Sequence, residues 1–127
     1  MPSNYILDPP HQLVRSRAWG VLTELESHEH YRRLKADPAF DPSFRQLCDL
    51  RDVTDLQAST AHLQDLAAQR VFATGARRAF VAPTDLYFGL ARMLQAFCDI
   101  EGSTIGVFRT MAEAEEWLEL QIPPPGP

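Results

Sequence analysis

The sequence is poor in cysteine and lacks any long hydrophobic run. Cys48 and Cys98 are its two cysteines, and neither belongs to a CxxC or a Cys/His ligand spacing. This pattern argues against a disulfide framework and is typical of buried, reduced thiols in a cytosolic protein. No apolar run reaches the roughly 18 residues that a membrane-spanning helix needs, and the N-terminus lacks a basic region followed by an apolar stretch. We therefore expect a cytoplasmic protein without a transmembrane segment.

Concentrated positive charge is also lacking. The chain carries 12 Lys and Arg against 17 Asp and Glu, which gives a formal net charge of −5, and its basic residues are scattered. Binding to nucleic acid or to an anionic membrane needs a basic patch or stripe. Neither is therefore expected as a partner. A chain of 127 residues is long enough for one compact domain and too short for two ordinary ones.

Motifs for catalysis and metal binding are lacking as well. The sequence contains no GxSxG, no P-loop and no GxGxxG, so we assign no enzymatic activity and no cofactor. The pairs that lie one helical turn apart are Glu24 with His28 and Glu26 with His30. Each supplies two ligands where zinc takes three or four, so we expect no metal site. Instead, the apolar surroundings of His28 predict a partly buried packing histidine.

What the sequence does contain is a regular alternation of strand-like and helix-like segments. The predicted strands are 5–7, 13–19, 46–50, 78–81 and 104–108, and the predicted helices are 24–36, 84–98, 110–120 and one that starts at Thr54 or Ser59 and ends near 71. This order, ββαβαβαβα, predicts an α/β fold with a five-stranded mixed sheet in a single domain over residues 1–120. Residues 121–127 include four prolines and are predicted to form a disordered tail.

The stretch 47–60 is the first candidate site. It runs from the predicted central strand through a charged segment, which we expect to be a loop, into a helix start. Strand ends and helix N-termini in α/β sheets often carry function. The candidate binding or regulatory residues are Asp49, Arg51, Asp52, Asp55, Ser59 and Thr60. The aspartates could hold an acid/base pair, but capping and turn formation are their more usual roles in such a position.

The predicted third helix is the second candidate site, because its apolar surface is wider than one sheet face covers. Its polar side chains fall in one narrow arc, and Phe88 projects there one turn before Arg92, where the two could stack. Such a surface is covered by the first and last helices of the same chain, by a second subunit in a homodimer, or by an apolar ligand. The candidate interface residues are Tyr87, Phe88 and Arg92.

Several short motifs carry a resemblance to a known group of proteins. They are 47–51 (LCDLR), 78–83 (RAFVAP), 88–93 (FGLARM), 107–108 (VF) and 113–118 (EAxxWL). Together they resemble the SpoIIAA-like small bacterial proteins, which are grouped with the STAS and SEC14 (CRAL-TRIO) folds, and the resemblance covers about residues 4–120. It implies a five-stranded sheet with helices mainly on one face and a biochemical role that is largely undefined.

The resemblance also implies two kinds of function. Better understood relatives are anti-sigma factor antagonists, which bind a partner kinase and are phosphorylated on a serine at the start of the helix after the central strand. That serine corresponds to Ser59, although the usual Ser-Gly-Leu is replaced here by Ser59-Thr60-Ala61. We thus expect a nonenzymatic binding or regulatory module that acts through protein contacts. The alternative, implied by the SEC14 side, is a carrier of a small apolar or lipid-like ligand.

Overall fold

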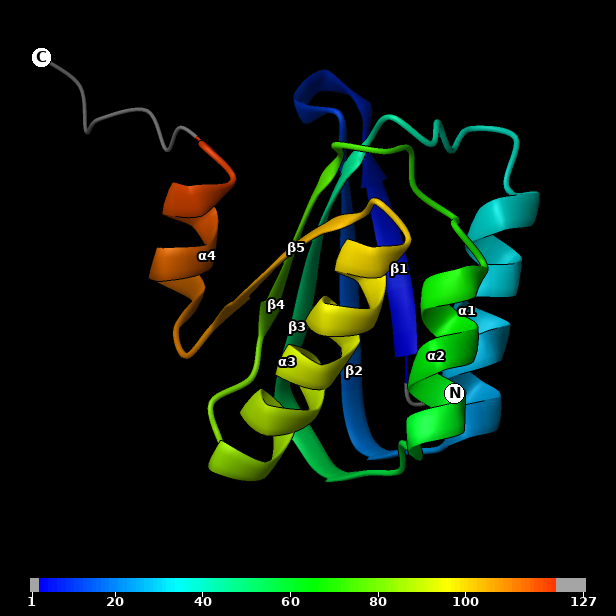
Figure 1. The fold of residues 1–127 in the computed structure, drawn as a ribbon. Coiled ribbons are helices and arrows are strands. Elements are labelled where there is room, and N and C mark those ends of the chain that lie inside the picture. The colour runs from blue at the N-terminus through cyan, green and yellow to red at the C-terminus, as the bar shows by residue number, and fades with distance from the viewer. Residues whose placement is uncertain (1–2, 121–127) are drawn as a thin grey trace, which may run out of the picture.

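The chain folds around one mixed sheet. The structure, a computed structural model, describes residues 3–120; the predicted tail, 121–127, lies outside them. The strands are β1 (Ser3–Asp8), β2 (Leu13–Leu22), β3 (Arg45–Leu56), β4 (Arg77–Val81) and β5 (Thr104–Phe108), in the spatial order β1-β2-β3-β4-β5 (Figure 1). β1 pairs antiparallel with β2 through a turn that contains the 3-10 helix η1 (Pro9–His11), and all later pairs are parallel. The predicted α/β class and element order are confirmed.

Each α-helix begins at a hydroxyl side chain that accepts a hydrogen bond from a free backbone N–H of the first turn. The helices are α1 (Glu24–Ala36), α2 (Thr60–Ala68), α3 (Asp85–Ile100) and α4 (Met111–Trp117), capped by Thr23, Ser59, Thr84 and Thr110. Of the two predicted starts for the second helix, Ser59 is correct. α2 ends three residues before the predicted Val71, because Arg70 has a left-handed backbone with φ of 48°. α4 ends at Trp117, before the predicted end near Leu120.

The helices lie on both faces of the sheet, with three on one face and one on the other (Figure 1). Strand residues alternate between the faces. In β3, Cys48 packs in the cluster that contains α2 and α3, whereas Leu47 packs in the cluster with Ala114 and Leu118 at α4. Val14 packs beneath α1 in a third cluster. The implied arrangement, with helices mainly on one face, is therefore correct.

The central strands are longer than the sequence predicts. β2 continues through Gly20 to Leu22, and β3 continues from Leu50 to Leu56. β4 pairs with β3 only as far as Asp49, whereas β2 and β3 stay paired to Leu22 and Leu56. The charged segment predicted as a loop is thus strand. Arg51, Asp52 and Asp55 in it are exposed, whereas Leu50 and Val53 pack into the core with α2 and α3.

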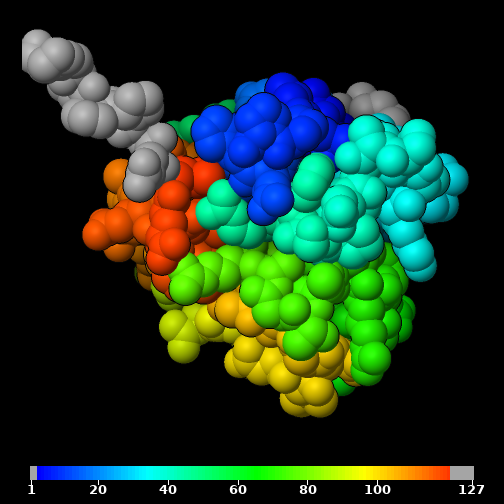
Figure 2. All heavy atoms as spheres, turned by 90° about the horizontal axis from the view of Figure 1, so that it is seen from above, coloured from blue at the N-terminus to red at the C-terminus, as the bar shows by residue number. Residues whose placement is uncertain are grey.

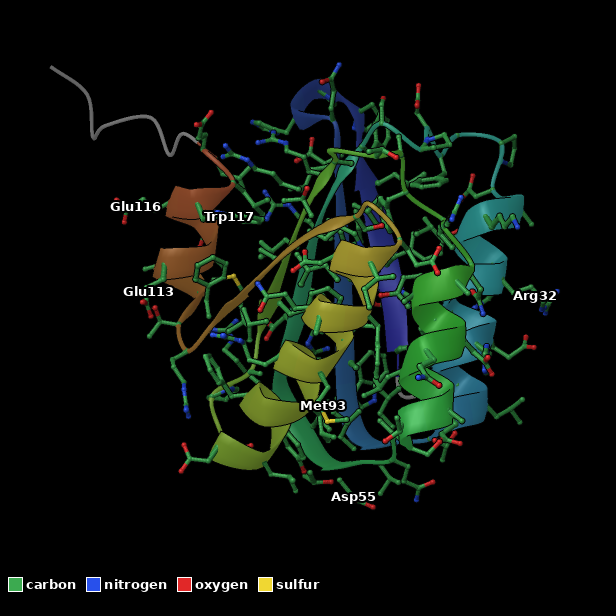
Figure 3. The ribbon with its side chains drawn as sticks, viewed as in Figure 1. Arg32, Asp55, Met93, Glu113, Glu116 and Trp117 are labelled. Atoms are coloured by element: carbon green, nitrogen blue, oxygen red, sulfur yellow. The ribbon has the colours of Figure 1, made fainter. Side chains whose placement is uncertain are left out.

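Aromatic packing attaches α4 to the sheet. The rings of Trp117 and Phe108 lie 5.5 Å apart, and Arg77 stacks on Trp117 with its guanidinium carbon 5.4 Å from the ring centroid. Figure 3 shows Trp117 pointing from α4 toward the sheet, while Glu113 and Glu116 point outward. Gly106 in β5 leaves the space that these rings occupy. Trp117 therefore serves packing.

Loops close the end of the molecule at which β3 begins. The backbone N–H of Arg45 donates to Gln12 at 2.8 Å, and that of Ala73 donates to Pro42 at 2.8 Å. Figure 2 looks onto this end, where the β1–β2 turn (blue) lies beside the loop before β3 (turquoise). The opposite end, toward the C-terminal ends of the parallel strands, contains the cavity described below.

Candidate functional site

The structure separates the predicted polar site into two parts. Cys48 and Leu50 pack toward α2 and α3, so Asp49 between them points to the face of α4. Ser59 caps α2, which lies on the other face. A phosphate on Ser59 would therefore not lie beside Asp49. The reason is that β3 continues through the segment predicted to be a loop, and side chains of a strand point to opposite faces of the sheet.

Asp49 forms an ion pair with Arg51 on the face of α4. Nη2 of Arg51 lies 2.9 Å from Oδ2 of Asp49, and Nε lies 2.9 Å from Oδ1. Partial burial raises the pKa of Asp49, but the hydrogen bonds from Arg51 outweigh it and hold the pKa below its usual value. Asp52 pairs with Arg17 at 2.9 Å, and both of these side chains are exposed. A general acid needs a raised pKa, and Asp49 has the opposite.

Ser59 is exposed, and its Oγ accepts a hydrogen bond from the backbone N–H of His62 at 3.1 Å. Its own backbone N–H donates to a carboxylate oxygen of Glu24 at 2.6 Å, and this bond holds the pKa of Glu24 below its usual value. The start of α2 thus already has an anionic partner from the start of α1. Thr60, the first residue of α2, is exposed beside it.

The predicted contacts of α3 are partly wrong. Phe88 is half-buried and stacks with Arg109, whose guanidinium carbon lies 4.1 Å from the ring centroid, and not with Arg92, which is exposed. Tyr87 is 8% exposed and belongs to the core of its own chain, so little of it is left for a partner. Arg109 takes the position over Phe88 because it also binds Asp85, at 2.7 Å.

The wide apolar surface of α3 is buried within the chain, although not by the helices we expected. The sheet and α2 cover it, whereas α4 lies on the opposite face of the sheet. Its most buried residues follow one stripe at helical spacing, Tyr87, Ala91, Leu94 and Cys98. Leu86 and Ile100 stay exposed.

A cavity of about 80 Å³ lies between the sheet and helices α1 to α3. Its walls are mainly apolar and come from the C-terminal parts of β2 and β3 and from facing residues of all three helices. The apolar lining residues are Ala18, Leu22, Cys48, Leu50, Leu56, Ala58, Leu63, Leu66, Phe80, Leu90, Ala91 and Leu94. Mostly apolar walls with a few polar groups are the usual composition of a small-molecule site.

Polar side chains interrupt this apolar wall at a few points. Ser3 is 3% exposed, His30 5% and His62 4%, and all three line the cavity. Within residues 3–120, Oγ of Ser3 and Nδ1 of both histidines have no hydrogen-bond partner. Leaving such a group unmatched costs about 1–3 kcal/mol. Each of these atoms is itself buried, so the surface that faces a bound molecule is almost wholly apolar.

Both cavity histidines are held in their neutral form. Burial lowers the pKa of His30 to about 4, assisted by the nearby charge of Arg33. Burial also lowers the pKa of His62. His62 packs edge-on against His28 at 4.9 Å between ring centroids, and Nδ1 of His28 accepts a hydrogen bond from Gln69 at 2.9 Å. The prediction that His28 is a partly buried, hydrogen-bonded packing residue is confirmed.

Sequence reasoning missed the cavity histidines. In the sequence, His30 stands out only as a possible metal ligand, and His62 belongs to no recognisable motif. One local signal existed: strand alternation directs Ser16 inward between the outward-pointing Arg15 and Arg17, which places a hydroxyl in the core. Its partner His30 comes from α1, and no spacing rule connects the two.

Within residues 3–120, no group of three or more His, Cys, Asp or Glu side chains is arranged to hold a metal ion. The described helices also include none long and apolar enough to cross a membrane.

The element order, the mixed sheet and the placing of the helices define an α/β protein with a SpoIIAA-like fold. The chain is similar to an uncharacterized protein of the DUF3478 family from Shewanella loihica PV-4, whose crystal structure has this fold. The TM-score is 0.55 at 19% identity, over 84% of this chain and 83% of that chain. This likeness shows the fold alone and confirms that part of the resemblance. No protein-family profile matches the chain, and no curated protein matches it.

Proposed function

We propose that this protein is a nonenzymatic binding module whose ligand is a small, mainly apolar molecule held in the cavity between the sheet and α1 to α3. The observation that carries the proposal is the cavity itself, whose exposed walls are almost wholly apolar. Of the two expected functions, this observation favours the ligand carrier. A ligand carrier is still a nonenzymatic binding module, the class that the resemblance implies.

The apolar wall would supply most of the affinity. Removing apolar surface from water contributes roughly 25 cal/mol per Å², and a ligand in such a cavity buries most of its surface. A cavity of about 80 Å³ has room for a molecule of only a few heavy atoms unless the walls move.

Filling the cavity tests this proposal. Ala91 lies on α3 with its side chain in the wall, so Ala91→Leu places a larger side chain in the space where the ligand would lie. We expect this variant to lose the thermal stabilisation that a cyclic hydrocarbon such as cyclopentane gives the wild type. Ala96→Leu makes the same change at an exposed position of α3 and should keep the stabilisation. Equal behaviour of the two variants would contradict a ligand site here.

A second candidate function, regulation through protein contacts at the start of α2, is favoured by one observation. Ser59 is an exposed helix cap, and a phosphate there would gain from the helix dipole and the free N–H groups. It would also meet the Glu24 carboxylate, which already accepts from Ser59. Intact-mass measurement on protein from its native host tests the modification. Glu24→Gln should make phosphorylation of Ser59 easier, because it removes the repulsion between the phosphate and the Glu24 carboxylate.

A further inference from the structure

The cavity between the sheet and helices α1 to α3 is long for its volume and reaches solvent on one side. We propose that it is a channel that takes the unbranched apolar chain of a small molecule end-on, through a mouth between α2 and α3. This inference rests on the proposed function and deepens it, because it names the shape of the ligand. A polar group at the outer end of such a chain would stay in water at the mouth.

The lining residues extend across four neighbouring strands. Ser16, Cys48 and Phe80 lie in register on β2, β3 and β4, and Ser3 adds β1. Neighbouring strands lie about 4.8 Å apart, so a space that reaches from β1 to β4 is about 14 Å long. A volume of about 80 Å³ over such a length leaves a passage only one hydrocarbon chain wide. A ring or a branched skeleton would have to push the walls apart, which a close-packed interior resists.

The position of the mouth follows from the exposure of the lining side chains. Most of the apolar lining residues are buried, and those that keep accessible surface are Leu56, Ala58, Leu66 and Leu90. They come from the end of β3, the connection to α2, and the two helices α2 and α3. The mouth therefore lies between α2 and α3, beside the end of β3 (Figure 1). Arg17 also lines the cavity, but its side chain points to the other face of the sheet and pairs with Asp52.

Apolar surface continues from the mouth along the outside of α3. Met93 lies one turn after Leu90 and Leu86 one turn before it, so the three side chains share one side of the helix. Met93 is 39% exposed and Leu86 is 67% exposed. Figure 3 shows Met93 beside α3 on the side toward α2. An apolar chain end that meets this surface thus has a continuous apolar path to the mouth.

The inner end of the channel lies under α1. Ser27 and Tyr31 of α1 line it together with Ser3 of β1. Oγ of Ser3 is itself buried, and the hydroxyl of Tyr31 accepts a hydrogen bond from Gln46 at 3.2 Å. The surface that faces the channel is therefore almost wholly apolar. A polar group that reached this end would lose its water without gaining a partner, so the inserted end of the ligand must be apolar.

A series of 1-alkanols tests the length and width of the channel. Affinity should rise about fourfold with each added methylene from 1-butanol to 1-octanol, the effect of burying one more CH₂ group. 1-Hexanol should bind about tenfold more tightly than cyclohexanol, which has the same number of carbons, because the ring overpacks a passage one chain wide. Dissociation constants come from ligand titrations followed by NMR.

Filling the inner end separates binding in the channel from adsorption to exposed apolar surface. Ser27→Leu places a larger side chain there, so 1-octanol should lose about 15-fold in affinity, the contribution of two methylenes, while 1-butanol keeps its affinity. Ala36→Leu adds the same side chain at an exposed position of α1 and should bind both alcohols as the wild type does.

Intermolecular NOEs in the wild type form a second measurement, which does not depend on any variant folding. We expect the methyl end of 1-octanol to contact Tyr31 and its hydroxyl end to contact Leu56 or Leu90. Equal affinity for 1-hexanol and cyclohexanol, an affinity that does not rise with chain length, equal losses in the two variants, or the reverse orientation would overturn the channel, while the cavity as a ligand site would stand. Failure of cyclopentane and of every alkanol to bind would overturn the proposed function as well.

Discussion

Arg78 donates a hydrogen bond from Nε to Oε1 of Gln46 at 3.0 Å, in the interior of the protein. The guanidinium is 6% exposed, and within residues 3–120 no carboxylate lies within ion-pair distance of it. Its carbon instead lies 4.6 Å from the ring centroid of Phe72 and 5.6 Å from that of Tyr31. Neutral acceptors and aromatic faces therefore replace a counter-ion here.

The first prediction concerns this contact. Gln46→Leu removes the acceptor and should lower the free energy of unfolding by about 3 kcal/mol, because it leaves a buried charge with one partner fewer. Arg78→Leu with Gln46→Leu should cost less than the sum of the two single changes, by about 1–3 kcal/mol, since each single change leaves its partner unmatched. Urea denaturation of the four proteins measures the coupling, and strictly additive effects would contradict it.

The second prediction concerns pH. The unfolded chain protonates His30 near pH 6.5 and the folded chain only near pH 4. Between these values the unfolded state binds more protons, so the free energy of unfolding falls as pH falls, by about 3 kcal/mol over the whole window for this residue. The lowered pKa of His62 acts in the same direction. Carboxylates with lowered pKa values, such as Asp49, lose their stabilising effect only at a pH below the range in which His30 acts.

Urea denaturation between pH 7.5 and pH 4.5 checks this dependence. The variant His30→Gln should show a shallower fall than the wild type, because glutamine does not titrate. Ala96→Leu, which changes no titratable group and lies at an exposed position of α3, should keep the wild-type slope. Parallel curves for all three proteins would rule out a neutral, buried His30.

The third prediction concerns the thiols. Burial raises the pKa of Cys48 to about 12 and also raises that of Cys98, so neither forms the reactive thiolate near neutral pH. A thiol reagent such as DTNB should therefore label neither in the native protein and both after denaturation. Ile100→Cys, at a position 81% exposed, serves as a positive control that should react at once. Rapid labelling of the native wild type would contradict the burial of both thiols.

The fourth prediction compares two glycines. A methyl group on Gly89 meets no atom within 4 Å, so Gly89→Ala in α3 should stabilise the protein by about 1 kcal/mol through helix propensity. A methyl group on Gly106 would lie 2.7 Å from the Phe108 ring and 3.2 Å from Trp117, so Gly106→Ala should destabilise by about 1–3 kcal/mol. Thermal denaturation gives both signs, and a stabilising Gly106→Ala would contradict the packing at α4.

Self-association through α3 stays a prediction. Phe88 and Arg92 keep exposed surface, although Arg109 and not Arg92 stacks on the ring. Phe88→Glu should convert a homodimer to a monomer in sedimentation without unfolding it, because aromatic and Arg side chains are enriched in such interfaces. Arg109→Gln is the matched control: it removes the stacking partner and the ion pair with Asp85 but keeps the Phe88 ring. A wild-type monomer at high concentration would exclude the dimer.

Local residue patterns determined most of the architecture. The Thr23, Thr84 and Thr110 caps place three helix starts correctly, because capping is decided by one hydroxyl and an N–H two or three residues away. The order of the elements could also be predicted, because strands and helices each have their own spacing of apolar residues along the sequence. Strands that alternate with amphipathic helices indicate a largely parallel sheet.

Only the tertiary structure decided the site. The strand extension of β3 exists because β2 pairs with it, so Asp49 and Ser59, close in sequence, lie on opposite faces of the sheet. Buried hydrogen bonds link Arg78 to Gln46, Gln46 to Ser16 and Ser16 to His30. They join β4, β3, β2 and α1, which meet only after folding. A cavity is the space that packing leaves between such distant segments, and therefore no local pattern in the sequence encodes it.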